Sequence, residues 1–132
     1  MTLTGFHHLT VRVSDLDRSR AFYSALPEFV LDQDFPDRAK LRYRIGTSGA
    51  RLVLCAPLPG TPDGDRFDEH RIGLDHIAVG VSGGRDALAE LESALLRAGA
   101  PTDGVHLDRA GEQAMITFRD PDNVQWEFFE EG

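Results

Sequence analysis

The chain has 132 residues, 41% of them hydrophobic, and its 14 basic and 22 acidic residues give a net charge of −8. Nucleic acids and anionic lipids are bound by clustered basic residues, and Lys40 is the only lysine, so we expect neither a nucleic-acid partner nor a membrane partner. A single cysteine, Cys55, and the lack of a membrane-length apolar stretch or a basic leader indicate a cytoplasmic protein.

The first half of the sequence predicts one strand, one helix and three more strands. The first strand covers about residues 6–13, and its side chains alternate between two faces. The apolar side chains share one face and the polar ones share the other: Leu9, Val11 and Val13 against His8, Thr10 and Arg12. Ser14 is the expected N-cap of a helix that runs to about residue 26. Three strands follow, near residues 28–33, 40–45 and 51–56.

The second half predicts the same elements in the same order. Residues 58–71, rich in Pro, Gly and Asp, form the expected linker. Residues 76–81 alternate like a strand, and residues 85–98 are the clearest helix of the chain, with Gly99 as its C-terminal stop. Strands are expected near residue 105 and over residues 114–118 and 124–129.

The two halves repeat each other at a constant spacing. A histidine opens the first strand of each half, at His8 and His76 (76 − 8 = 68), and Ser14 and Ser82 keep the same offset (82 − 14 = 68). Each half has room for several elements, so this is a duplication. We therefore predict an α+β fold of two βαβββ modules, in which each helix covers one face of its sheet and leaves the other face free.

Three side chains on the free faces are suited to binding a metal ion. His8 and His76 lie opposite the valines of their strands, and Glu127 lies opposite Trp126 and Phe128 on the last strand. Two neutral imidazoles and one carboxylate form a facial set of ligands that leaves positions open for water or substrate oxygens. Alternation alone leaves a second interpretation open, namely two hydrogen-bonded histidines and a solvated glutamate.

Three stretches of the sequence resemble the vicinal oxygen chelate superfamily, which includes glyoxalases, extradiol dioxygenases and bleomycin-resistance proteins. They are "HHLTVRVSDLDRSRAFY", "LDHIAVGV" and "FRDPDNVQWEFF". The resemblance implies one domain over residues 1–132, with modules at about 5–57 and 72–131 that form a curved mixed sheet around a metal-binding cavity. It also implies that His8, His76 and Glu127 bind a divalent ion, one of Fe, Mn, Zn or Ni.

Two departures from the family limit what the resemblance implies about the reaction. Glyoxalases carry a fourth ligand, a glutamate, on the fourth strand of the first module, where this chain has Leu54. Extradiol dioxygenases carry a tyrosine where this chain has Thr117. Negligible glyoxalase activity is therefore expected, and ring cleavage is not claimed.

The resemblance implies a metal-dependent lyase or dioxygenase that acts on a small molecule with two adjacent oxygens. Thr10, Arg12 and Thr117 fall on the free faces and are the expected substrate-binding residues. The alternative is a metal-free protein that sequesters a small molecule, as the bleomycin-resistance branch does. We expect a homodimer, because the family usually pairs its modules within or between chains.

Overall fold

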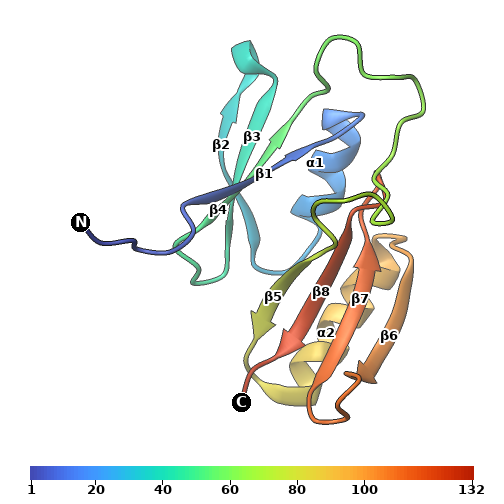
Figure 1. Ribbon diagram of the computed structural model, residues 1–132. Helices are drawn as coiled ribbons and strands as arrows, with labels where there is room; N and C mark the ends of the chain where they lie inside the picture. The colour runs from blue at the N-terminus through green and yellow to red at the C-terminus, as the bar shows by residue number, and fades with distance from the viewer. The chain divides into compact units, whose positions relative to one another are not determined.

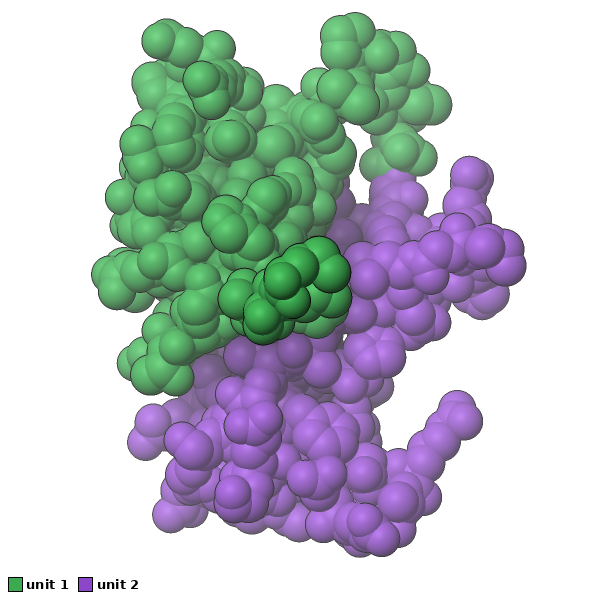
Figure 2. All heavy atoms as spheres, turned by 60° about the vertical axis from the view of Figure 1, so that its left-hand side comes forward, with its two compact units in different colours: residues 1–65 green, residues 66–132 purple.

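The structure, a computed structural model, describes residues 1–132 and divides into two compact units. Unit 1 comprises residues 1–65 and unit 2 comprises residues 66–132 (Figure 2). The boundary falls inside the segment 58–71 that the sequence predicts as a linker. Each unit consists of one helix and one four-stranded sheet, and each is described by itself (Figure 1).

Unit 1 contains one parallel and two antiparallel strand pairs. Its elements are β1 (His8–Arg12), α1 (Leu16–Ser24), β2 (Phe29–Phe35), a 3-10 turn (Pro36–Arg38), β3 (Lys40–Ile45) and β4 (Arg51–Cys55). The strand order is β1-β4-β3-β2, with β1 parallel to β4. α1 contacts β2 and β4, and its buried Tyr23 packs near Tyr43 of β3, with 6.3 Å between the ring centroids. The core of unit 1 therefore lies between α1 and its sheet.

Unit 2 repeats this topology. Its elements are β5 (Ile77–Val81), α2 (Gly84–Arg97), β6 (Thr102–Leu107), β7 (Ala114–Arg119) and β8 (Gln125–Glu130), and the strand order is β5-β8-β7-β6. α2 packs across all four strands (Figure 1). Its apolar stripe meets Phe118, Trp126 and Phe128, all fully or almost fully buried, and the Phe118 and Phe128 ring centroids are 4.9 Å apart. These aromatic rings and the leucines of α2 form the core of unit 2.

The predicted order of strand, helix and three strands is confirmed in both halves. The predicted mixed sheet is present as two sheets of four strands, one in each unit. Both predicted helices are present, although α1 ends at Ser24, two residues before its expected end. Neither helix is long and apolar enough to cross a membrane.

The expected N-cap of α1 is wrong by one residue. Asp15, in extended conformation, caps the helix, because its carboxylate accepts a hydrogen bond from the backbone N–H of Arg18 at 3.0 Å. The Ser14 hydroxyl instead accepts a bond from the Arg18 guanidinium at 2.7 Å. In unit 2 the cap position is Gly83, at the same 68-residue offset (83 − 15 = 68), and no side chain caps that helix. The two caps are therefore equivalent in position and different in chemistry.

Candidate metal centre

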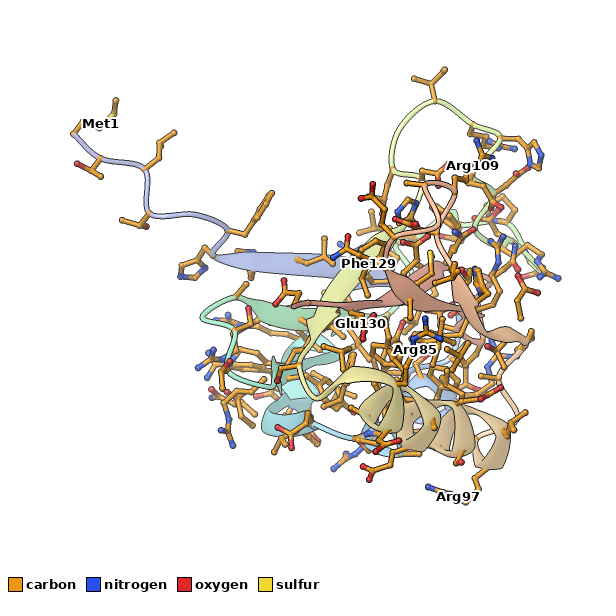
Figure 3. The ribbon with its side chains drawn as sticks, turned by 90° about the horizontal axis from the view of Figure 1, so that it is seen from below. Met1, Arg85, Arg97, Arg109, Phe129 and Glu130 are labelled. Atoms are coloured by element: carbon orange, nitrogen blue, oxygen red, sulfur yellow. The ribbon has the colours of Figure 1, made fainter.

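Each sheet has one face that its own helix does not cover, which we call the helix-free face. In unit 1, His8, Thr10 and Arg12 lie on this face and are exposed, whereas Val11 on the opposite face is 7% exposed. In unit 2, Glu127 lies on the helix-free face between buried Trp126 and Phe128. In Figure 3 Phe129 lies on the side of β8 away from α2, and Glu130 lies on the side of α2. The predicted alternation is therefore present.

His76 and Glu127, two of the three predicted ligands, lie together in unit 2. His76 immediately precedes β5, and Ala78 of β5 pairs with Glu127 of the parallel strand β8. The distance from His76 Nε2 to Glu127 Oε2 is 3.4 Å, and the two side chains are 37% and 13% exposed. The pair is thus partly shielded and still open to solvent on one side.

Asp75 fixes the proton of the His76 ring. Its Oδ1 lies 2.7 Å from His76 Nδ1, and a carboxylate at this distance accepts a hydrogen bond from Nδ1–H. In the neutral imidazole the lone pair is then on Nε2, the nitrogen that faces Glu127. A carboxylate on the second ring nitrogen is the usual partner of a metal-ligating histidine.

The donor set fits a divalent ion. Two ligands bonded to one ion at about 2.0–2.2 Å, at angles between roughly 90° and 110°, lie about 2.8–3.6 Å apart. The observed 3.4 Å between His76 Nε2 and Glu127 Oε2 matches that separation. It is too long for a strong hydrogen bond between the two atoms. The pair is therefore spaced as two neighbouring metal ligands would be.

His8, the third predicted ligand, belongs to unit 1. Its Nδ1 lies 2.8 Å from the Nδ1 of His7, so one of these two nitrogens donates to the other. His7 occupies the position of Asp75 in the repeat (75 − 68 = 7), and both residues bond to Nδ1 of the histidine that follows. No three His, Cys, Asp or Glu side chains gather in metal-binding geometry. The role of His8 as the third ligand stays a prediction.

The predicted substrate-binding residues occupy different settings. Thr117 of β7 is half-buried and lies directly across from Glu127 in the pairing of β7 with β8. Thr10 is exposed on β1 opposite Val53. Arg12 is also exposed, and its Nη1 donates to the carbonyl oxygen of Ala56 at 2.8 Å. Thr117 therefore lies directly across from a candidate ligand, and Thr10 lies two residues after His8 on the same face of β1.

The position that corresponds to Glu127 in unit 1 is Val53, and the assignment to Leu54 is wrong. Thr10 pairs with Val53 as its repeat partner Ala78 pairs with Glu127 (78 − 68 = 10). Leu54 pairs with Val11 and is fully buried on the helix side. The expectation that this strand supplies no carboxylate ligand is unaffected, because valine has no ligand atom.

Within unit 2, a salt bridge joins the segment before β5 to the end of β7. Arg119 at the end of β7 donates to both carboxylate oxygens of Glu69, at 2.9 and 2.6 Å, and also to the carbonyl oxygen of Asn123 at 3.1 Å. The Asn123 amide donates to the carbonyl oxygen of Phe67 at 2.9 Å. The hydrogen bonds from Arg119 lower the pKa of Glu69 to about 2. These contacts hold residues 67–69 against the β7–β8 turn.

Sequence reasoning assigned no role to Asp75 or His7. Both bond to a candidate ligand, and both immediately precede the histidine that opens a repeat. The 68-residue offset of the repeat could therefore have identified both residues. It pairs the two positions even though one holds a carboxylate and the other an imidazole.

The whole length of the chain resembles known proteins. The sequence matches the Glyoxalase/Bleomycin resistance protein/Dioxygenase superfamily over residues 5–128. It is 26% identical to the uncharacterized protein YwkD of Bacillus subtilis, over 99% of this chain and 100% of that protein. A glyoxylase/bleomycin resistance protein/dioxygenase domain from a Frankia species is 27% identical, with a TM-score of 0.83, and the match covers 99% of this chain and 94% of that one.

A further solved structure contains a metal ion. It is a mutant of the fosfomycin resistance protein FosX from Listeria monocytogenes, complexed with Mn(II) and dihydroxypropylphosphonic acid. It is 20% identical to this chain, with a TM-score of 0.72, and the match covers 97% of this chain and 90% of that one. At this identity the likeness shows a shared fold.

Proposed function

Because the chain belongs to the Glyoxalase/Bleomycin resistance protein/Dioxygenase superfamily, we propose that it is a divalent-metal-dependent enzyme whose small-molecule substrate binds the metal through two adjacent oxygens. The observation that carries this proposal is the arrangement of His76 and Glu127, 3.4 Å apart, with Asp75 directing the lone pair of His76 toward Glu127. Asp68 makes the same contact with Nδ1 of His70, so the feature that sets His76 apart is the Glu127 carboxylate 3.4 Å from its other ring nitrogen.

Each residue of the proposed site would have its own role. His76 Nε2 and the Glu127 carboxylate would hold the ion, with His8 as the third ligand. Asp75 would keep the His76 ring in its binding tautomer. When bound, the ion would act as a Lewis acid on a substrate oxygen. Thr117 pairs with Glu127 across the strands, and its hydroxyl would donate a hydrogen bond to a substrate atom beside that ligand.

We propose a class of metal ions and not one particular ion. Imidazole and carboxylate ligands together suit Fe, Mn, Zn or Ni. The Mn(II) complex of the structural neighbour FosX supports a divalent ion in this fold.

The proposed site lacks a residue that efficient glyoxalase chemistry needs. That chemistry moves a proton between adjacent carbons and needs a carboxylate that can act as an acid and a base. Val53 stands where unit 1 would supply one. We therefore expect negligible lyase turnover of the hemithioacetal of methylglyoxal and glutathione. Robust turnover that His76→Ala abolishes would contradict this expectation.

Metal content tests the proposed site directly. We expect wild-type protein, loaded with Zn²⁺ or Mn²⁺ and dialysed against a weak chelator, to retain metal, and Glu127→Gln to lose most of it. The loss should exceed the roughly 10–100-fold that follows removal of an outer-shell partner. Glu130→Gln is the matched control, because Glu130 lies on the other side of β8 (Figure 3). Equal retention by wild type and Glu127→Gln would overturn the site and favour the metal-free binding alternative.

We also propose that the chain forms a homodimer. β1 and β5 are edge strands, each hydrogen-bonded to one neighbour in its sheet, and unpaired strand edges are sites where chains associate. Sedimentation equilibrium should give twice the chain mass of 14.6 kDa. A monomer mass at every concentration tested would refute the dimer.

A further inference from the structure

The helix-free face of unit 1 carries an unusual number of positive charges. Five of the 14 basic residues of the chain lie on it by register and alternation. They are Arg12 of β1, Arg51 of β4, and Lys40, Arg42 and Arg44 of β3. One carboxylate, that of Asp32, accompanies them, so the face has a net charge of +4 (5 − 1), whereas the whole chain has −8. Concentrated charge of one sign attracts ligands of the opposite sign.

Asp32 aligns two of these guanidinium groups. An extra residue in β2 lies between Leu31 and Gln33, at a bulge opposite Arg42. From this bulge Asp32 Oδ1 accepts from Arg42 Nε at 2.9 Å, and Oδ2 accepts from Arg51 Nε at 3.2 Å. The Asp32 side chain is 16% exposed. One carboxylate, partly shielded by the two arginines, thus fixes both of them by their Nε atoms.

The ends of these arginines remain available. Arg42 makes no hydrogen bond through its two terminal nitrogens, and Arg51 uses only Nη1, which donates to the carbonyl oxygen of Gly49 at 3.2 Å. The two side chains are 39% and 33% exposed. Two of the cations also make cation–π contacts with Phe35: Lys40 Nζ lies 5.0 Å and Arg42 Cζ 5.9 Å from the centroid of its ring. A fork of free N–H donors is the geometry that binds carboxylates and phosphates.

A purely structural network would not need this arrangement. Exposed ion pairs contribute little to stability, and five like charges on one face repel one another. Asp32 neutralises one of those charges and leaves the rest unbalanced. A structural pair in the same unit looks different, since Arg20 of α1 donates through its terminal Nη1 to Asp34 at 3.1 Å. Arg42, by contrast, bonds Asp32 through Nε, and its two terminal nitrogens make no hydrogen bond within the protein.

We propose that the helix-free face of unit 1 binds the oxyanion group of a small molecule, a carboxylate or a phosphate, through the terminal nitrogens of Arg42 and Arg51. Lys40 and Arg44 add positive charge on the same strand. Arg51 is the cross-strand neighbour of His8, so the bound anion lies beside the predicted third ligand. The identification of this anion as part of the substrate rests on the proposed function, whereas anion binding itself does not.

Isothermal titration of metal-free protein with inorganic phosphate and with succinate tests the proposal. We expect wild type to bind at least one probe, and Arg42→Gln and Arg51→Gln each to bind it at least about tenfold more weakly, as loss of a charged hydrogen bond implies. Arg42→Lys keeps the charge without the fork and should fall between. The stronger of the two probes identifies the anion as phosphate-like or carboxylate-like.

Arg20→Gln is the matched control, because it removes the same group from the helix side of the same unit. Circular dichroism confirms that each variant is folded. Absence of binding by wild type, or an equal loss in Arg20→Gln, would overturn the proposal. Metal retention measured on Arg42→Gln should equal that of wild type, so a failed metal site and a failed anion site give different results.

Discussion

Replacing Asp75 by alanine should weaken metal binding without removing a ligand. Asp75 touches His76 only through the 2.7 Å bond from Nδ1, and it is not itself among the proposed ligands. Without this acceptor, the neutral His76 ring is free to carry its proton on Nε2, the nitrogen that the metal needs. Asp75→Asn still offers an oxygen to Nδ1–H and should be affected less than Asp75→Ala.

The expected magnitude follows from the exposure of Asp75. Loss of an outer-shell carboxylate typically costs about 10–100-fold in metal affinity. The Asp75 side chain is 65% exposed, so water competes for the same bond and replaces part of it after the mutation. We therefore expect a loss near the lower limit, about tenfold for Asp75→Ala, with the proposed ligands still in place.

Competition with a chromophoric chelator for Zn²⁺ measures this affinity directly. Asp68→Ala is the matched control, because Asp68 Oδ1 also lies 2.7 Å from the Nδ1 of a histidine, His70, which no predicted ligand approaches. That variant should bind Zn²⁺ like wild type. Nitrogen NMR of the metal-free protein should show the His76 proton on Nδ1 in wild type. Unchanged affinity in Asp75→Ala would refute the assigned role.

Three further outcomes can be measured. Ser19→Ala should stabilise the protein by about 1 kcal/mol in denaturant unfolding, because the Ser19 hydroxyl is buried without a hydrogen-bond partner; a loss of stability would show that it has one. The pKa of Glu69 falls from 4.5 to about 2 on folding, so its pairing with Arg119 stabilises the fold above pH 4.5, and this contribution disappears as the pH falls through about 2. Glu69→Gln should therefore be less stable than wild type at pH 7, the difference should shrink as the pH falls and vanish only well below pH 2, and a constant difference would contradict the pairing. Mixing His8→Ala with Glu127→Gln should restore metal binding in a fraction of dimers if the ligands come from two chains, and in none if they come from one.

The repeat and the alternation of side chains were visible in the sequence because both follow from strand geometry. A period of two residues assigned the faces of His8 and Glu127 correctly. The exact partner of a residue on another strand depends on register, which alternation does not determine, and register places Val53 across from Thr10 where the sequence alone predicts Leu54. The bulge at Asp32 is likewise a property of pairing. The expected cap Ser14 is one residue away from the observed cap Asp15, because residue type does not determine where the helical backbone begins.

The valine at position 53 has a consequence for what the duplicated halves can each do. The two units share a topology, yet unit 2 places a carboxylate at this register position and unit 1 places an aliphatic side chain. Unit 1 can therefore contribute His8 and no carboxylate to the proposed site, which has three ligands from the chain and lacks a fourth. Val53→Glu would supply the missing acid on a strand that already holds the right register. Gain of hemithioacetal turnover in that variant would mean that a single codon separates two chemistries on one scaffold.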